Sequence, residues 1–339
     1  MERPLNIATL PAGTWGAAFS KIAAEAGHNV RMLLRDTVDY QTFLDSRQYL
    51  RRLPGIEFPE NVTATNSAQA TLEGADVVVL APPSKFLRSS YREIREENPQ
   101  GVPIILLTKG LERDTNKTGS QVLEDEEPGI SQRLAVLSGP NFAEEAAAGL
   151  PMATTLASSN FPLAERLQHD FSSPTFRIYA QNDVLGVELG GAIKNVVAFA
   201  AGIGDGLKRG ESARAALIDR GLIEVIKFVT SVGGKPETLM GLSGVGDLIL
   251  TCTSDLSRNH QAGKELAEGK ITPQDLFTDK ERTVEALYTV RAVVELARAH
   301  DIEVPIAKAV YMVLYEKLSI EKAYISLMGR PLVHENGQR

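Results

Sequence analysis

Three separated segments of the 339-residue chain place polar side chains among apolar ones. Lys109 comes directly after an apolar run, at the position where open α/β sheets bind ligands. Lys194 interrupts an apolar stretch of helical spacing, and residues 244–259 supply an acid, hydroxyls, a guanidinium and an amide. An ammonium can stabilise a developing negative charge and then donate a proton, while a guanidinium beside an amide suits a phosphate.

Ordinary structural roles explain the same residues when each is taken singly. A lysine such as Lys194 can extend out of a helix to solvent, Asp247 can cap a helix, and Arg258 can pair with a surface acid. Cys252 is predicted to be a packing residue, because no activating base lies near it in the sequence. The five histidines show no metal-ligand spacing, so we predict no metal site.

A glycine turn follows the first apolar run. Residues 11–16 read Pro-Ala-Gly-Thr-Trp-Gly, the dinucleotide-binding pattern G-x-G-x-x-G with proline in the first position. Gly13 would let the backbone approach a pyrophosphate, and Gly16 would permit close packing of a helix on a strand. Proline removes one backbone donor but keeps Leu10 extended, as the end of a strand requires. A turn that only connects a strand to a helix also accounts for these residues.

The residue that distinguishes the two nicotinamide dinucleotides is expected about twenty positions beyond the last glycine. Arg35 and Asp36 stand there. An arginine accommodates a 2′-phosphate and favours NADPH, whereas an acid binds the ribose hydroxyl and favours NADH. A solvated surface pair explains both charges equally well. The order of the two residues favours NADPH, and NADH stays open.

Two kinds of domain are needed to position these side chains. As far as residue 180, short apolar runs alternate with helical segments, which predicts βαβ units and a mostly parallel sheet. From Val184 onward, alanine- and leucine-rich segments of helical spacing predict an all-α domain. The expected strands are Leu5–Leu10, Asn29–Leu34, Ala75–Ala81, Val102–Thr108, Leu134–Leu137, Ala153–Ala157 and Phe176–Tyr179, with C-terminal helices at Gly190–Gly202, Ala213–Val232, Thr283–His300 and Val304–Glu316. We therefore expect an α/β domain at residues 1–185 and an all-α domain at 186–339.

Composition restricts the class of protein. The 36 Lys and Arg against 43 Asp and Glu leave a net charge of −7, which argues against a nucleic-acid partner. The single cysteine excludes a disulfide framework within the chain and a multi-cysteine zinc site, and it fits a reducing compartment. We see no signal peptide and no stretch approaching the ~20 apolar residues of a membrane span. A cytoplasmic protein is therefore expected.

Six stretches resemble the bacterial-type NAD(P)-dependent glycerol-3-phosphate dehydrogenases, in the same order and over nearly the whole chain. They are Ala12–Ala18, Thr108–Glu112, Ser138–Glu145, Gly186–Val197, Ala213–Leu222 and Gly241–Asn259. The resemblance implies a reversible NADPH- or NADH-dependent reduction of dihydroxyacetone phosphate to sn-glycerol 3-phosphate, which feeds phospholipid synthesis. It also implies a Rossmann N-terminal domain, an all-α C-terminal domain and, usually, a homodimer.

The resemblance also implies a role for each residue that matches a functional position of the family. Lys194 matches the catalytic lysine, which would stabilise the charge on the ketone oxygen and then protonate it. Lys109 would support Lys194 electrostatically and orient the substrate. The implied substrate contacts are Lys109, Gly139, Asn141, Lys194, Asp247, Ser257, Arg258 and Asn259; the cofactor contacts are Thr14, Trp15, Arg35, Lys109, Ala143, Arg258, Thr283 and Glu285, to which the turn adds Gly13 and Gly16.

Four positions depart from the family pattern. Pro11 replaces the first glycine of the turn, and Ala286 replaces the glycine of a Val-Glu-Gly segment, so both lie at the expected cofactor site. Ser212 and Asp219 stand where asparagine and threonine are common. Two alternatives to the dehydrogenase therefore stay open: a related reductase of another small carbonyl compound, and a divergent non-catalytic paralogue that binds a phosphorylated metabolite.

Overall fold

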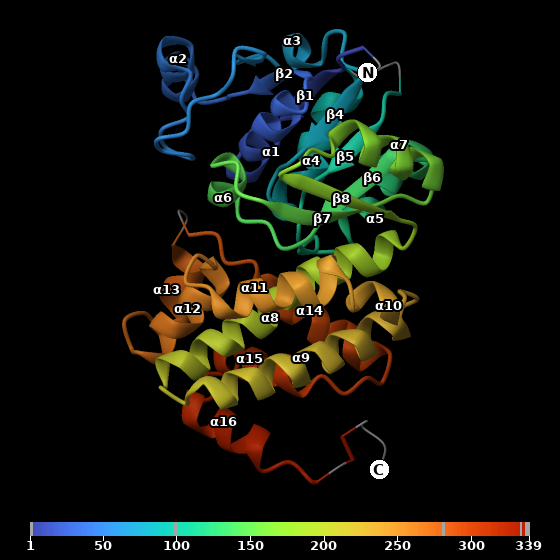
Figure 1. Ribbon diagram of the computed structural model, residues 1–339. Coiled ribbons are helices and arrows are strands. Elements are labelled where there is room, and N and C mark those ends of the chain that lie inside the picture. Colours follow the sequence, from blue (N-terminus) through green and yellow to red (C-terminus); the bar gives the residue numbers. More distant parts are fainter. Residues whose placement is uncertain (1–2, 98–100, 280–281, 333, 336–339) are drawn as a thin grey trace. The chain divides into compact units, whose positions relative to one another are not determined.

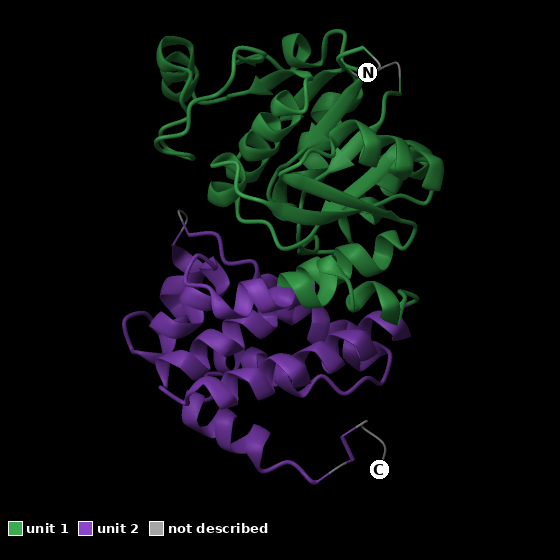
Figure 2. Cartoon of the chain, viewed as in Figure 1, with its two compact units in different colours: residues 1–192, 233–247 green, residues 193–232, 248–339 purple. Residues whose placement is uncertain are grey.

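The computed structural model describes residues 3–97, 101–279, 282–332 and 334–335. The chain forms two compact units, one of residues 1–192 with 233–247 and the other of residues 193–232 with 248–339 (Figure 2). The sequence-based division after residue 185 thus differs from this one at two places, residues 186–192 and 233–247.

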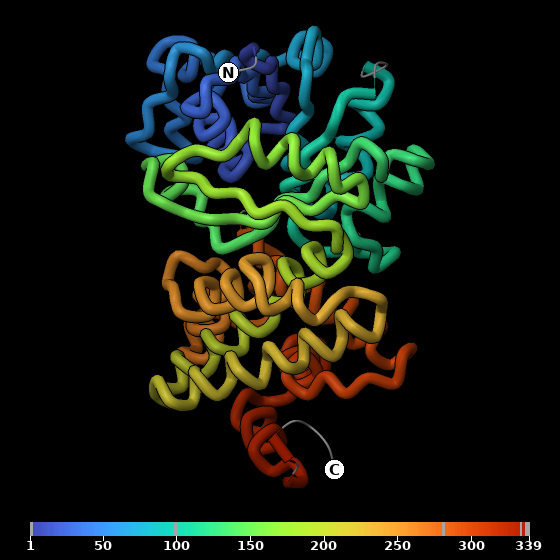
Figure 3. Tube along the Cα trace, turned by 45° about the vertical axis from the view of Figure 1, so that its right-hand side comes forward, coloured from blue at the N-terminus to red at the C-terminus, as the bar shows by residue number. Residues whose placement is uncertain are grey.

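The first unit is built on an eight-stranded sheet of order β3-β2-β1-β4-β5-β6-β7-β8 (Figure 1). Neighbouring strands are parallel from β3 to β6; β7 is antiparallel to β6, and β8 is parallel to β7. Figure 3 shows the chain segments of β7 and β8 running side by side, in green and yellow-green. The strands are β1 Asn6–Leu10, β2 Asn29–Leu33, β3 Val62–Thr65, β4 Val77–Leu80, β5 Ile104–Leu106, β6 Leu134–Ser138, β7 Met152–Ala157 and β8 Phe176–Gln181. The predicted, mostly parallel sheet is confirmed. Only the edge strand β3 was missed, because Val-Thr-Ala-Thr is short and half polar.

Helices cover both faces of this sheet, because side chains along each strand alternate between two cores. Ile7 and Val79 pack with α1, α2, α6 and α7, whereas Ala8 and Leu80 pack with α3, α4, α5 and the start of α8. The helices with residues in this unit are α1 Thr14–Glu25, α2 Thr37–Ser46, α3 Ala68–Leu72, α4 Leu87–Arg95, α5 Gly119–Glu126, α6 Ala143–Ala147, α7 Phe161–Phe171, α8 Val184–Gly206 and α10 Pro236–Leu239, with the π-helical η3 at Leu242–Gly246.

A buried carboxylate explains why residues 233–247 belong to the first unit. Asp183 Oδ1 accepts a hydrogen bond from the Gly186 N–H (3.0 Å) at the start of α8. Its Oδ2 accepts from the Lys235 N–H (2.9 Å) and from the Thr238 hydroxyl (2.6 Å). Asp183 thereby ties the segment before η3 to the helix that leaves the sheet. This long-range link has no counterpart in local periodicity, so the sequence did not indicate it.

Helix α8 is long and apolar enough to cross a membrane by length and composition alone, with a mean hydropathy of 1.5 over its most apolar window. The sequence-based expectation that no apolar stretch approaches the length of a membrane span did not take α8 into account. Within the protein, however, 83% of that window is buried. The apolar composition of α8 is therefore that of a core helix.

Within its described residues, the second unit contains helices and no strand, as predicted. It comprises the rest of α8 with α9 Glu211–Ser231, α11 Asp247–Thr253, α12 Arg258–Ala267, α13 Pro273–Thr278, α14 Ala286–Ala299, α15 Pro305–Tyr315 and α16 Ile320–Met328. Helix α15 contacts α9, α13, α14 and α16, which makes it the central element of this unit. The helices α8, α9, α14 and α15 were predicted, and the shorter α11, α12, α13 and α16 were not.

Glu224 attaches α15 to α9. Its buried carboxylate accepts hydrogen bonds from the backbone N–H groups of Ile306 (2.8 Å) and Ala307 (2.9 Å), in the first turn of α15. These donors have no partner within the helix, and a negative charge there complements the helix dipole. Burial nevertheless raises the pKa of Glu224 to about 7, although the two N–H groups oppose this rise.

The stability of the protein should therefore depend on pH through Glu224. Because the pKa of about 7 in the fold exceeds the ordinary 4.5, the stabilising contribution is complete below pH 4.5 and is lost as the pH rises through 7. The loss is up to about 3 kcal/mol of unfolding free energy. Urea unfolding near pH 5 and near pH 8.5 measures it. We expect Glu224→Gln to abolish this dependence and the exposed Glu316→Gln, at the far end of α15, to retain it; equal pH dependence in both variants would contradict the assignment.

Candidate active site

Lys109 lies just beyond β5, at the carboxyl end of the sheet. Its Nζ donates to Asp247 Oδ2 (2.8 Å) and to the backbone oxygen of Gly139 (3.0 Å). Asp247 is 1% exposed, whereas the Lys109 side chain is 23% exposed. An ammonium has three donors, and these two contacts orient it. The partly open face of Lys109 can therefore present a donor to an anionic ligand.

The segment after β6 passes close to β7. A Cβ at Gly139 would lie 2.8 Å from Thr154 Oγ1, so a larger residue does not fit. Asn141 Nδ2 donates to the backbone oxygen of Ala153 (3.2 Å). Among the described residues, the buried Asn141 Oδ1 and Ser138 Oγ have no hydrogen-bond partner. Buried polar atoms are nearly always satisfied, so these two atoms are exceptions in the first unit.

Helix α8 approaches this segment at a glycine. A Cβ at Gly191 would lie 2.5 Å from Ser138 Oγ and 3.9 Å from Lys109 Cδ. Lys194 follows Gly191 by three residues on the same helix, and residues three apart share a face.

Glu188 fixes α8 one turn before Gly191. Its buried carboxylate accepts hydrogen bonds from the Ser120 N–H (2.8 Å) and from the Ser120 hydroxyl (2.5 Å) at the start of α5. Burial raises the pKa of Glu188, while the bonds from Ser120 oppose this rise. Sequence reasoning missed Glu188; the available signal was an acid inside an apolar helical segment.

In the second unit, Lys194 is 7% exposed and its neighbour Asn195 is also buried. The interpretation of Lys194 as a lysine extending to solvent is therefore wrong. Its Nζ donates to the Thr251 hydroxyl (2.6 Å) of α11. Sequence reasoning did not select Thr251 as a site residue, although it follows Asp247 by four residues and so lies on the same helix face.

Asn259 joins three elements of the second unit. Its Nδ2 donates to Asn195 Oδ1 (3.1 Å), and its Oδ1 accepts from the Ala286 N–H (3.0 Å). Ser257 caps α12, and Arg258 is exposed at the first position of that ten-residue helix. Within the described ranges Arg258 has no ion-pair partner. Arg258 and Asn259 therefore stand at a helix N-terminus, where anions are favoured.

The glycine turn of the first unit fits a dinucleotide phosphate. The first bond within α1 runs from the Ala17 N–H to the Gly13 oxygen (2.8 Å), so the three preceding N–H groups lie at the open end of this 12-residue helix. Packing requires Gly16, because a Cβ there would lie 3.0 Å from Ala81 Cβ. Packing does not require Gly13, whose Cβ would meet only the Ala81 oxygen, at 3.9 Å. The missing side chain at Gly13 instead leaves the helix end accessible to a pyrophosphate.

The other predicted cofactor residues lie at element boundaries. Thr14 and Trp15 open α1, and Ala143 opens α6 in the same unit. Trp15 Nε1 is buried without a hydrogen-bond partner among the described residues. In the second unit, Thr283 and Glu285 precede α14. Arg35 lies beyond β2, where its guanidinium pairs with the carboxylate of Glu93.

The four departures from the family pattern have different settings. Leu10 ends β1 in the extended form expected before Pro11. Ala286 is buried and opens α14. Ser212 and Asp219 are exposed on α9. The Asp219 carboxylate accepts a hydrogen bond from Arg220 Nε (2.8 Å). All four substitutions are therefore compatible with the local fold.

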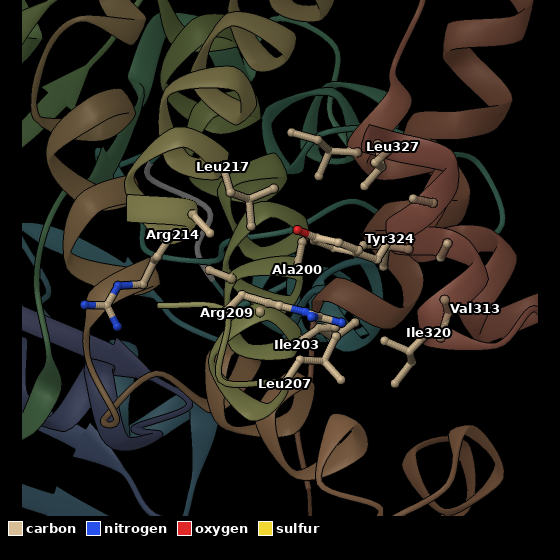
Figure 4. Close-up of a pocket in the computed structure, with 17 residues that line it drawn as sticks. Ala200, Ile203, Leu207, Arg209, Arg214, Leu217, Val313, Ile320, Tyr324 and Leu327 are labelled. Carbon is tan, nitrogen blue, oxygen red and sulfur yellow. The ribbon is translucent and has the colours of Figure 1, made fainter. Parts of the chain in front are cut away.

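An apolar cavity of about 100 Å³ lies within the second unit, lined by α8, α9, α15 and α16 (Figure 4). Leu207, Leu217 and Val313 are among its lining residues. The Arg209 guanidinium lies over the Tyr324 ring, 4.6 Å from its centroid. None of the predicted site residues lines this cavity, so the cavity is not part of the candidate active site. Within the described residues, no three His, Cys, Asp or Glu side chains are grouped as metal ligands.

Known proteins resemble this chain over nearly its full length. Family models described as the N-terminus and the C-terminus of NAD-dependent glycerol-3-phosphate dehydrogenase match residues 6–164 and 183–325. The glycerol-3-phosphate dehydrogenase (NAD(P)+) of Symbiobacterium thermophilum is 43% identical over 331 residues, which is 98% of this chain and 96% of the relative. The crystal structure of a glycerol-3-phosphate dehydrogenase from Coxiella burnetii matches with a TM-score of 0.89 at 37% identity, over 96% of this chain and 99% of that one. A ketopantoate reductase from Ralstonia eutropha has a TM-score of 0.57 at 16% identity, over 94% of this chain and 100% of that one, and shares only the fold.

The contact at Gly191 makes a specific prediction. In Gly191→Ala, the new methyl group would collide with Ser138 Oγ at 2.5 Å, whereas Ser138 Cβ is 3.6 Å away. We expect Gly191→Ala to lower the free energy of unfolding by about 1–3 kcal/mol. The double variant with Ser138→Ala should recover most of this loss, because the colliding oxygen is gone. Chemical denaturation of the wild type, the two single variants and the double variant measures these free energies. A loss in the double variant equal to the sum of the two single losses would contradict the prediction.

Proposed function

Because the chain belongs to the NAD-dependent glycerol-3-phosphate dehydrogenase family, we propose that it reversibly reduces dihydroxyacetone phosphate to sn-glycerol 3-phosphate with NADH or NADPH. The observation that carries this proposal is the way two lysines are held. Lys109 is bound to the buried Asp247, and Lys194 is buried with its ammonium on the Thr251 hydroxyl. Two oriented ammonium groups suit a substrate that is anionic and becomes more negative during reduction.

Lys194 is the proposed catalytic residue. The reduced nicotinamide, when bound, supplies a hydride to the carbonyl carbon. Lys194 stabilises the negative charge on the carbonyl oxygen and then protonates that oxygen. Thr251 orients the ammonium by accepting one of its N–H groups at 2.6 Å. The burial of Lys194 strengthens this electrostatic interaction by keeping water away.

Lys109, Asp247, Gly139 and Asn141 orient the substrate in this proposal. Asp247 and the Gly139 oxygen occupy two donors of the Lys109 ammonium and leave the third for the substrate. The unpartnered Asn141 Oδ1 can accept a bond from a substrate hydroxyl. These contacts set which part of the substrate is presented for reduction.

Ser257, Arg258 and Asn259 bind the phosphate in this proposal. Arg258 supplies a guanidinium at the N-terminus of α12, where the helix dipole also favours an anion. Asn259 uses one N–H of its amide on Asn195 and retains a second for a phosphate oxygen. The net-acidic chain thus has a local site for a phosphorylated substrate.

We assign dinucleotide binding to the domain at residues 1–185 and substrate binding mainly to residues 186–339. Gly13, Thr14, Trp15 and Gly16 would hold the pyrophosphate at the start of α1. The remaining proposed cofactor contacts are Arg35, Lys109, Ala143, Arg258, Thr283 and Glu285. Their matching positions in the family support this assignment.

The proposed setting is a cytoplasmic homodimer whose product feeds phospholipid synthesis. Cys252 is buried and makes no disulfide, which fits a reducing compartment. The packing role predicted for Cys252 agrees with its complete burial. Family membership supports the product and the dimer.

Oxidation of NADPH or NADH by the purified protein with dihydroxyacetone phosphate tests this function. We expect turnover with at least one cofactor, and Lys194→Ala should lower kcat by about 10²–10⁴-fold because the proton donor is lost. The affinity of Lys194→Ala for the dinucleotide should be unchanged. Lys308→Ala, which removes an exposed lysine of α15, is the control. No turnover by the folded wild-type protein would overturn the function, and substantial turnover by Lys194→Ala would overturn the role of Lys194.

A further inference from the structure

Arg35 is held by a glutamate that sequence reasoning did not consider. Its Nη1 donates to Glu93 Oε1 (3.0 Å) and its Nη2 donates to Glu93 Oε2 (2.6 Å), a bidentate pair. The two side chains are 49% and 42% exposed. Both lie in the first unit, Arg35 just beyond β2 and Glu93 on α4. A parallel fork of this kind occupies the guanidinium edge that would otherwise bind a phosphate.

The pair lies beside the glycine turn in the topology of the sheet. Strands β2 and β4 flank β1, and α4 follows β4 along the chain (Figure 1). The Arg35–Glu93 pair therefore links the segments beyond the two neighbours of β1. The turn at residues 11–16 follows β1 itself. In this topology, that is the end of the sheet where a dinucleotide binds.

Asp36, the other candidate for the ribose, is already engaged. Its Oδ1 caps α2 by accepting from the N–H groups of Val38 (2.9 Å) and Asp39 (3.1 Å). Its Oδ2 lies 2.8 Å from Arg51 Nη2. The Asp39 N–H, with Arg51, holds the pKa of Asp36 below its usual value. Asp36 thus has a structural role, and the choice of cofactor falls to the Arg35 pair.

We propose that Glu93 is a specificity-determining residue that disfavours the 2′-phosphate of NADPH and so favours NADH. This inference rests on the proposed dehydrogenase function. A 2′-phosphate that takes the Nη1/Nη2 edge of Arg35 must displace Glu93, and one that binds the remaining N–H groups lies near a carboxylate of like charge. A ribose that carries a 2′-hydroxyl leaves the pair intact. Glu93 therefore acts through Arg35 and needs no contact with the reacting atoms.

Two nucleotides that undergo no redox reaction test the proposal by isothermal titration calorimetry. 2′,5′-ADP carries the distinguishing phosphate, and 5′-ADP lacks it. In Glu93→Gln, we expect 2′,5′-ADP to bind about three- to tenfold tighter, because an exposed ion pair of this kind is worth up to about 1 kcal/mol and the like charge is also removed. The affinity for 5′-ADP should stay unchanged. The matched control is Glu96→Gln, which removes the same charge from an exposed site one turn along the chain.

A double-variant cycle separates action through Arg35 from a general charge effect. Arg35→Ala should weaken 2′,5′-ADP binding, and Glu93→Gln should then have no effect in the Arg35→Ala background. Equal changes for both nucleotides, an equal effect of Glu96→Gln, or a persisting effect without Arg35 would overturn the role of Glu93 while leaving the dehydrogenase function intact. If neither nucleotide binds the folded wild-type protein, the proposed function fails and this inference fails with it.

Discussion

Helix α8 packs so closely on the end of β6 that a Cβ at Gly191 would lie 2.5 Å from Ser138 Oγ, which would then have to shift. Two buried carboxylates maintain this closeness. Asp183 binds the first turn of α8 together with residues 233–247, and Glu188 binds the start of α5. The helix is thus held at its beginning and one turn before Gly191.

Two lysines are the main candidates for the chemistry of the active site. Gly191 leaves room beside the Lys109 side chain, whose ammonium is oriented by Asp247 and Gly139. Further along α8, Lys194 is buried and oriented by Thr251. A lysine is seldom buried unless it has a partner. The buried Lys194 has such a partner in Thr251, and the half-buried Lys109 has one in Asp247.

Much of the fold was predictable because it depends on local pattern. Strands buried on both faces appear as continuous apolar runs, so β4 and β5 were recognised, as were long helices such as α8 and α9. The edge strand β3 and the shorter helices α11, α12, α13 and α16 were missed, since a few mixed residues carry little periodicity. The candidate site depended on resemblance instead. Glu188, Thr251 and Glu93 were not selected, because their partners are 68, 57 and 58 residues away in the sequence.

In the proposed reaction, a hydride passes from the nicotinamide to the ketone carbon of dihydroxyacetone phosphate. Mass spectrometry of the product formed with a cofactor deuterated on the transferring face of the nicotinamide C4 is the direct test of this step. We expect glycerol 3-phosphate that carries one deuterium on its central carbon. Cofactor oxidation without deuterium in glycerol 3-phosphate would mean that the hydride does not reach this substrate.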